Sequence, residues 1–258
     1  MKNRLLPLLF ILGIALPTSG TFAADLSLEK SWQLDGLRNP ESVVYDAQRK
    51  CLYVSNINGS SSARDNNGFI SKVSLLGKVI KMRWAIGLNA PKGLAIATDH
   101  LYVADIDELV EIELDSGAIS HRYPDAEAKF FNDVAAADDG TVYVSDSMTN
   151  TIHRLQHGKF TRWLKSPDLR GPNGLLTETD RMLVAAWGTG EGTEAIPGQV
   201  LAVSMRDKSI TIVGNKKTQG NLDGIERTAS GDYFITNWML GKLLLLKHSG
   251  EVLTLLNL

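Results

Sequence analysis

Short runs in which apolar and polar residues alternate follow one another along most of the chain. Residues 52–56 (LYVSN), 142–146 (VYVSD) and 233–237 (YFITN) are clear examples, and Gly, Asn and Asp residues separate such runs. Alternation with a period of two is typical of half-buried β-strands, and no segment keeps the 3.6-residue period of a long helix. The pattern therefore predicts an all-β protein.

The strand-like runs form five repeats. Each repeat starts with a similar motif, and one residue of that motif, here called the anchor residue, marks the register. The anchor residues are Glu41, Lys92, Asn132, Asn173 and Asp223. Three further strand-like runs follow each motif. Four short strands in a repeat of about 40 residues are typical of a propeller blade. A β-sandwich is the alternative all-β fold, but it would not repeat a start motif at this interval.

The length of the chain predicts an incomplete ring. Residues 30–37 (KSWQLDGL) are interpreted as an N-terminal strand that closes the ring, yet the sequence stops at the fourth strand of the fifth repeat. Either five blades close the ring or most of a sixth blade is absent. We expect a six-bladed β-propeller architecture with five complete four-stranded blades, a closing strand, a truncated sixth blade and an open seam between the first and fifth repeats.

Two of the repeats are lengthened by insertions, residues 59–67 (GSSSARDNN) and 188–198 (GTGEGTEAIPG). Both follow the second strand of their repeat. Neighbouring strands of a blade are antiparallel, so the second strand ends on the face where the first begins. We expect both insertions to overhang the face that carries the anchor residues, unless they are simply surface loops.

Composition and charge restrict the class of protein. The chain has 258 residues, of which 43% are hydrophobic and 22% charged, with a formal net charge of −2 and no basic run. This balance excludes a disordered chain and argues against nucleic-acid binding. The single cysteine, Cys51, cannot form a disulfide framework, and its strand-like setting favours a buried, unreactive side chain.

The first 24 residues have the pattern of a secretory signal peptide. Lys2 and Arg4 precede an apolar run over residues 5–16, and small residues follow as far as Ala24. An uncleaved membrane anchor is the alternative. Cleavage would leave residues 25–258 as a single β-propeller domain, exported to the periplasm or secreted, without membrane contact and expected to be monomeric.

The anchor residues are the candidates for chemistry, because the first strand of a blade lines the central channel. Glu41, Asn132, Asn173 and Asp223 offer hard oxygen donors, and two of them are anionic. Carboxylate and amide oxygens favour a divalent cation such as Ca²⁺ over zinc. The alternative is structural, because Pro172-Asn173-Gly174 and Asp223-Gly224 are also typical of turns.

Lys92 has the same register and would bring a positive charge toward the axis. Desolvating a lysine is costly, so we expect it to pair with Glu41 or Asp223, stabilise a substrate oxygen or partly replace a metal. Trp187 and Trp238 follow second strands and could form pocket walls or pack between blades. Four polar residues that end second strands are interpreted as caps of the following turns: Asn56, Asp105, Asp146 and Asn237.

The motifs around the anchor residues resemble those of the SMP-30/gluconolactonase/LRE family of six-bladed propellers. The resemblance runs from Pro40-Glu41 through Phe131-Asn132-Asp133 and Pro172-Asn173-Gly174 to Asp223-Gly224. It implies a divalent metal, often calcium, held in the channel by Glu41, Asn132, Asn173 and Asp223. Sugar lactonases of the family often carry an arginine where this chain has Phe130, which argues against a sugar lactone as substrate.

Two functions from different classes are compatible with these residues. The first is a metal-dependent hydrolase of a lactone or related ester, with a small molecule as its partner, Asp223 as general base and Lys92 stabilising the developing oxyanion. The second is a non-catalytic propeller that binds a ligand or a protein, because fold alone does not confer activity.

Overall fold

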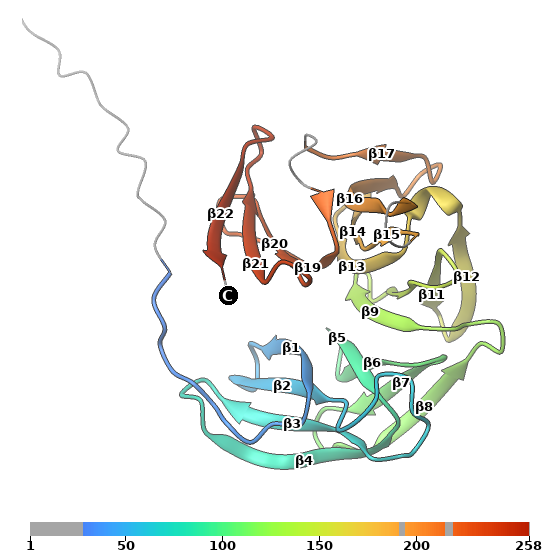
Figure 1. Ribbon diagram of the computed structural model, residues 1–258. Coiled ribbons are helices and arrows are strands. Elements are labelled where there is room, and N and C mark those ends of the chain that lie inside the picture. Colours follow the sequence, from blue (N-terminus) through green and yellow to red (C-terminus); the bar gives the residue numbers. More distant parts are fainter. Residues whose placement is uncertain (1–27, 191–193, 215–218, 258) are drawn as a thin grey trace, which may run out of the picture.

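The structure is a computed structural model, and it describes residues 28–190, 194–214 and 219–257 (Figure 1). The predicted signal peptide, residues 1–24, lies outside the described residues. The described chain is built mainly of β-strands, with the 3₁₀ turn η1 (Pro167–Leu169) between blades 3 and 4. The prediction of an all-β protein is confirmed.

The strands form five sheets, which are the blades of a β-propeller. Blade 1 consists of β1 (Pro40–Asp46), β2 (Cys51–Asn56), β3 (Gly68–Ser74) and β4 (Val79–Leu88). Blade 2 consists of β5 (Pro91–Ala97), β6 (His100–Asp105), β7 (Glu108–Glu113) and β8 (Ile119–Pro124). Blade 3 consists of β9 (Phe131–Ala136), β10 (Val142–Asp146), β11 (Thr151–Gln156) and β12 (Lys159–Lys165).

The last two blades follow the same order, and the fourth is enlarged. Blade 4 consists of β13 (Pro172–Thr177), β14 (Arg181–Ala186), β16 (Ile196–Ser204) and β17 (Ile210–Ile212), with the short strands β15 (Gly188–Thr189) and β18 (Gln219–Gly220) paired to β16. Blade 5 consists of β19 (Leu222–Arg227), β20 (Tyr233–Asn237), β21 (Lys242–Leu246) and β22 (Val252–Asn257). In every blade the first strand is innermost, so the anchor residues lie around the axis (Figure 1).

The blades are held together by apolar side chains between consecutive sheets. Four hydrophobic clusters were found among the described residues, and each of them joins one blade to the next along the chain. Cys51, for example, is 1% exposed and packs with Leu101 and Val110 of blade 2. The expectation of a buried, structural cysteine is confirmed.

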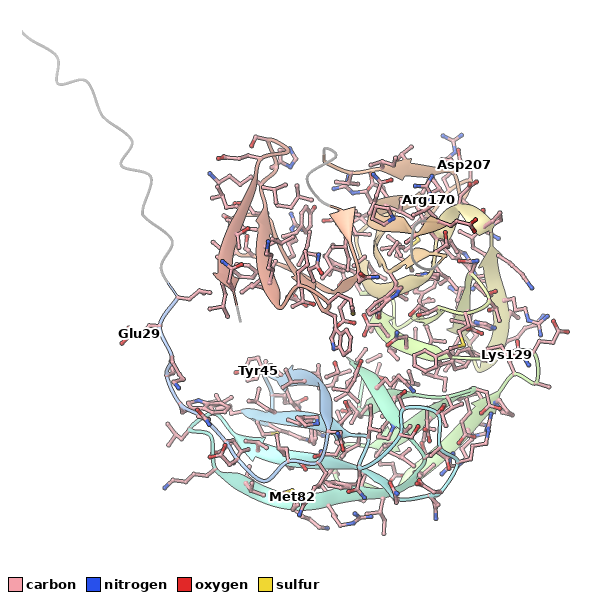
Figure 2. The ribbon with its side chains drawn as sticks, in the orientation of Figure 1. Glu29, Tyr45, Met82, Lys129, Arg170 and Asp207 are labelled. Carbon is pink, nitrogen blue, oxygen red and sulfur yellow. The ribbon has the colours of Figure 1, made fainter. Side chains whose placement is uncertain are left out.

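The predicted six-bladed architecture is wrong, because the structure has five blades. Among the described residues no cluster joins blade 5 to blade 1. Val43 and Tyr45 on β1 are 59% and 52% exposed, and Figure 2 shows Tyr45 on the side of blade 1 that faces blade 5. The two blades that share no apolar cluster are therefore the ones between which the sequence predicts a seam, the first and fifth repeats.

The predicted closing strand is also wrong, because residues 30–37 form no strand. The indole Nε1 of Trp32 donates a hydrogen bond to the carbonyl oxygen of Leu75 (3.0 Å). The indole ring lies so close to Gly77 that a Cβ there would overlap it. The segment is therefore docked on the turn between β3 and β4 of blade 1, away from the edge strand β22 that a closing strand would have to pair with.

No helix in the described part of the chain is long and apolar enough to cross a membrane.

A polar cluster ties the connection after blade 2 to blade 3. The carboxylate of Asp125 accepts two hydrogen bonds from Arg162 (2.8 and 2.6 Å) and lies 3.1 Å from Nε2 of the buried His153. The hydrogen bonds from Arg162 hold the pKa of Asp125 well below its usual range. Burial lowers the pKa of His153, and the Asp125 carboxylate opposes that change.

This cluster predicts acid sensitivity. A depressed carboxyl pKa stabilises the fold above the ordinary carboxyl value of about 4 and loses that contribution as the pH falls below it. His153 adds to the loss of stability below about pH 6.5, because the imidazole takes up a proton at a higher pH in the unfolded chain than in the fold.

We expect Asp125→Asn to lower the free energy of unfolding at pH 7 by about 1–3 kcal/mol and to flatten its decline in acid. Urea titrations between pH 3 and 8 measure both effects, with the exposed Asp99→Asn as control; parallel curves for Asp125→Asn and the wild type would contradict the prediction.

Candidate functional site

Every inner strand carries a β-bulge at its anchor residue. In β1 the register passes from Pro40 opposite Asn56 to Val43 opposite Val54, so Glu41 and Ser42 face a single residue, Ser55. The same two-against-one arrangement occurs at the other four anchor residues. A bulge bends the strand and redirects its side chains, which is common beside functional sites. The bulges therefore explain why five side chains of the same register converge.

In three of the blades, a side-chain hydroxyl group accepts the hydrogen bond of a backbone N–H that the bulge leaves without its partner in the ladder. The backbone N–H of the second bulge residue donates to a hydroxyl of the opposing strand, in Ser42 to Ser55 (2.9 Å), Asp133 to Ser145 (3.0 Å) and Gly224 to Thr236 (2.7 Å). These hydroxyls replace the ladder bond that a bulge removes. The Asn-Gly and Asp-Gly pairs thus lie in strands β13 and β19, and the interpretation of these pairs as turns is wrong.

The five anchor residues line one pocket of about 530 Å³ on the axis of the propeller: Glu41, Lys92, Asn132, Asn173 and Asp223. The volume lies within the range of small-molecule sites. The predicted metal ligands and both predicted catalytic residues, Asp223 and Lys92, are therefore brought together. We call this space the axial pocket.

The amide groups of the axial pocket are oriented by their nitrogens. Asn173 donates from Nδ2 to Oδ1 of Asp223 (2.8 Å), and Asn132 donates from Nδ2 to Oγ of Ser147 (3.1 Å). Ser147 in turn donates to the carbonyl oxygen of Pro172 (2.7 Å). Because each nitrogen is engaged with the protein, both Oδ1 atoms remain free of hydrogen bonds from the described residues and are available to a ligand.

The axial pocket brings together carboxyl groups whose charged forms are disfavoured. Burial, with the nearby carboxylates of Asp223 and Asp133, raises the pKa of Glu41 to about 8, and Lys92 opposes this increase. Glu41 nevertheless keeps a solvent-exposed surface on β1, so water screens its charge and limits this increase. Burial also raises the pKa of Asp223, while the hydrogen bond from Asn173 lowers it. Carboxyl groups in this state favour a bound cation, which would supply the missing countercharge.

The donor set fits a divalent cation that prefers oxygen. Two carboxylates and two amide oxygens converge, as in calcium sites. Among the described residues there is no group of three or more His, Cys, Asp or Glu side chains arranged to hold a metal. A cation in the axial pocket would therefore depend on the oxygens of Asn132 and Asn173 as much as on the carboxylates.

Lys92 is held by neutral partners. Its side chain is only 2% exposed, Nζ donates to the carbonyl oxygen of Ala90 (3.0 Å) and lies 4.4 Å from the centre of the Phe130 ring. Burial lowers its pKa to about 8, although Asp105 and Glu41 oppose this change. No ion pair joins Lys92 to Glu41 or Asp223 among the described residues, so the expected pairing is not formed. Phe130 thus provides a cation–π contact in place of a charge.

Aromatic side chains form the wall of the axial pocket. The rings of Trp187 and Trp238 lie 5.8 Å apart, and both residues line the pocket, as one of the two interpretations of the sequence predicted. Ser61 and Gly188 come from the two insertions and also line it. The expectation that both insertions overhang the anchor face is confirmed for these residues. Residues 191–193 of the second insertion lie outside the described residues.

The four polar residues at the ends of second strands are structural. Asp105, for example, accepts hydrogen bonds from the backbone N–H groups of Asn89 and Ala90 (2.8 and 2.7 Å), and Asp146 accepts from Lys129 and Phe130. The predicted capping of the following turn is confirmed for Asp146, which also accepts from the backbone of Met148 and Thr149, and for Asn237, which accepts from Leu240. It is wrong for Asp105 and Asn56, which instead accept from the segment that leads into their own blade. These residues fix the loops that lead into the bulges.

Sequence reasoning missed Asp133, the neighbour of Asn132 in the bulge of β9. One of its oxygens accepts the backbone N–H of Leu175 in blade 4 (2.8 Å), and the side chain packs on Gly93 in blade 2. Burial raises its pKa to about 7, although the backbone hydrogen bonds lower it. Asp133 links three inner strands beneath the axial pocket. Its position directly after an anchor residue was the only signal in the sequence.

Comparison with known proteins supports the fold. The family model of the SMP-30/gluconolactonase/LRE-like region matches residues 39–258. No curated protein matches the chain in sequence.

Solved structures share the architecture at low identity. A catalytically inactive virginiamycin B lyase from Staphylococcus aureus with quinupristin has a TM-score of 0.58 at 13% identity, covering 84% of this chain and 83% of that chain. A streptogramin B lyase has 0.58 at 9% identity, with 84% and 82% covered. A chain of a nidogen/laminin complex has 0.64 at 14% identity, with 84% and 79% covered. These likenesses concern the fold alone.

Proposed function

Since this chain belongs to the SMP-30/gluconolactonase/LRE-like family, we propose that it hydrolyses a lactone or a related ester in the axial pocket, with a bound divalent cation, by preference calcium. The observation that carries the proposal is the convergence of Glu41, Asn132, Asn173, Asp223 and Lys92 on one pocket. A purely structural set of polar residues would be expected to satisfy its own oxygens, and these leave both amide oxygens free.

The four oxygen-bearing anchor residues, Glu41, Asn132, Asn173 and Asp223, would hold the cation. When bound, the cation supplies Lewis acidity toward the carbonyl group of the substrate. A bound cation would favour the charged forms of Glu41 and Asp223, whose pKa values are raised without it. Because the site has only two carboxylates, we expect it to bind a hard cation with moderate affinity.

Asp223 is the proposed general base. It accepts a proton from the water that attacks the carbonyl carbon, and the ring C–O bond breaks as the proton passes to the leaving oxygen, which gives the hydroxy acid. Asn173 fixes the carboxylate by donating to Oδ1, so the second oxygen is left for the proton. Lys92 places an ammonium in a dry wall of the pocket, where it is positioned to stabilise negative charge on the carbonyl oxygen.

The walls favour a substrate with apolar parts. Trp187, Trp238, Phe130 and Met148 line the axial pocket, and the side chains of Trp238 and Met148 are 65% and 68% exposed. Aromatic and methionine side chains bind carbon skeletons of varied shape. We therefore propose a lactone or ester that carries an apolar substituent, in preference to a sugar lactone.

Removal of divalent cations tests the role of the metal. We expect the purified protein to hydrolyse at least one member of a panel of aliphatic and aromatic lactones and esters, to lose this activity in excess chelator and to regain it with Ca²⁺. A pH-stat or indicator assay of acid release measures the rate. Undiminished hydrolysis in chelator would contradict the metal requirement.

A ligand-binding propeller without catalysis is the second candidate. The observation that favours it is Lys92, which puts a cation in the wall of the pocket that would hold the metal. The absence of both hydrolysis and stoichiometric Ca²⁺ binding in the same panel would favour this function. For either candidate we propose an exported protein, because residues 1–24 have the pattern of a signal peptide. We also propose that it is a monomer with a small-molecule partner.

A further inference from the structure

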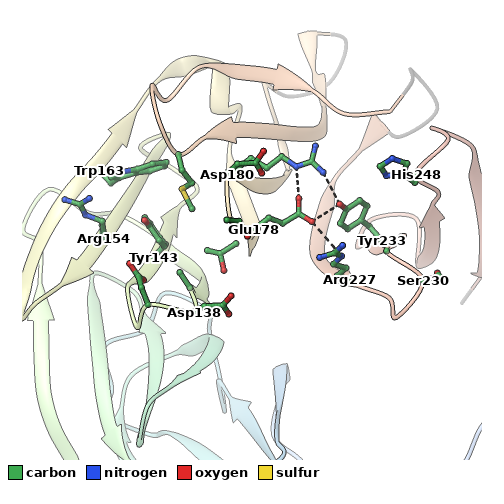
Figure 3. Close-up of a pocket in the computed structure, with 17 residues that line it drawn as sticks. Asp138, Tyr143, Arg154, Trp163, Glu178, Asp180, Arg227, Ser230, Tyr233 and His248 are labelled. Carbon is green, nitrogen blue, oxygen red and sulfur yellow. Dashed lines mark hydrogen bonds and ion pairs between the residues drawn. The ribbon is translucent and has the colours of Figure 1, made fainter.

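A second and larger pocket, of about 920 Å³, opens at the other end of the inner strands (Figure 3). It is lined by the turns that join first to second strands in blades 3, 4 and 5, such as residues 137–139, 178–180 and 230–231. The anchor residues lie at the opposite end of the same strands, and none of them lines this space. We call it the distal pocket.

One wall of the distal pocket presents an arginine that has no anionic partner among the described residues. Arg154 on β11 lies opposite Tyr143 on β10, and Trp163 packs edge-on against Tyr143 with ring centres 5.3 Å apart. Nε of Arg154 is buried and has no hydrogen-bond partner among the described residues, and the side chain interacts with that of Tyr143, but the guanidinium forms no ion pair with the described residues. The guanidinium therefore lacks a countercharge, and a carboxylate is the group that complements it best.

The opposite wall is a closed network. Glu178 accepts hydrogen bonds from Arg181 (2.6 Å) and from Tyr233 (2.8 Å), and Arg181 also donates to Tyr233 (3.1 Å) (Figure 3). Arg227 lies 3.9 Å from Glu178. Glu178 matches the charge of Arg181, so Arg227 leaves this wall with one excess positive charge. The hydrogen-bonded part of the wall provides a rigid side for a ligand.

Free carboxylates lie between the two walls. The side chains of Asp138 and Asp180 are exposed and form no hydrogen bond or ion pair with the described residues, whereas Asp139 accepts the backbone N–H of Thr141 (2.9 Å). Figure 3 shows Asp138 and Asp180 between the Trp163 and Tyr233 sides of the pocket. Carboxylates beside aromatic rings suit an ammonium group, which both attract.

We propose that the distal pocket binds a small zwitterion of the amino-acid or short-peptide class. Its carboxylate pairs with Arg154, and its ammonium lies against Asp138 and Asp180. The unpaired charges of the protein have opposite signs at separate places, and a ligand with both charges is the chemistry that complements them together. The proposal is independent of catalysis in the axial pocket.

Isothermal titration calorimetry with L-alanyl-L-alanine tests the proposal. We expect binding by the wild type, and at least about tenfold weaker binding of the N-acetylated dipeptide and of the dipeptide amide, because each lacks one charge. Arg154→Gln should weaken binding of the dipeptide but not change the already weak binding of its amide. The double variant Asp138→Asn/Asp180→Asn should show the reciprocal pattern with the N-acetyl form.

Matched controls separate this site from the axial pocket and from loss of folding. Asp99→Asn and Lys159→Gln change exposed charges elsewhere and should bind the dipeptide as the wild type does. Asp223→Asn and removal of Ca²⁺ should also leave dipeptide binding unchanged. No binding by the wild type at millimolar dipeptide, or binding that is equal in both distal-pocket variants with unchanged melting curves, would overturn the proposal.

Discussion

Asp223→Asn is expected to reduce lactone hydrolysis by at least about 100-fold, because the amide cannot accept the proton of the attacking water. The side chain keeps its shape, and its oxygen can still accept the hydrogen bond that Asn173 donates to Oδ1. The loss should therefore fall on kcat more than on KM. Steady-state kinetics on the best substrate of the panel, with saturating Ca²⁺, measure the effect.

The control for this variant is Asp99→Asn, which removes a carboxylate from an exposed turn outside the axial pocket. Its rate should equal that of the wild type. Circular dichroism melting of both variants shows whether folding is kept. If folded Asp223→Asn retains the wild-type rate with Ca²⁺ bound, Asp223 is not the general base.

Gly174→Ala is expected to lower the stability of the whole propeller. A Cβ on Gly174 would overlap the carbonyl oxygen of Asp223, and this neighbour belongs to the backbone of the adjacent inner strand. The strands β13 and β19 would have to separate, which costs on the order of 3 kcal/mol when a packed interior is overfilled. For a domain of this length, we expect the melting temperature to fall by about 10 °C.

Gly224→Ala provides the matched control, because Gly224 holds the same bulge position in blade 5. A Cβ there would meet only Oγ1 of Thr236, at 3.3 Å, and the hydroxyl can move slightly. Thermal melts of the two variants should differ by several degrees. Equal melting temperatures would show that the close approach at Gly174 does not limit stability.

The alternation of apolar residues and the repeated start motif were sufficient for much of the architecture. Both are local properties, since a strand that is buried on one face needs a period of two, and a blade needs four such strands. The blade order and the capping of the following turns by Asp146 and Asn237 followed from the sequence for the same reason. Both depend on neighbours within one repeat, whereas the burial of Cys51, although expected from its strand, is completed by Leu101 and Val110 of blade 2.

The number of blades and the place of residues 30–37 depended on long-range packing. A strand-like pattern says that a segment can pair, but the partner is decided by the edge that it reaches. Trp32 docks on the turn at Gly77 and holds that segment on blade 1. The sequence also did not predict which groups contact the ammonium of Lys92. These are the carbonyl oxygen of Ala90 and the aromatic ring of Phe130, and neither carries a charge.

The sequence by itself determined an all-β propeller of repeated four-stranded blades and placed five polar side chains in one register. Only the tertiary structure decided that a bulge at each of these positions turns them into a single pocket, and that Asp133 ties the strands beneath it. The physical reason is the close approach of inner strands, which glycine at positions 93 and 174 allows. Such an approach is a relation between repeats, and the pattern within any one repeat does not contain it.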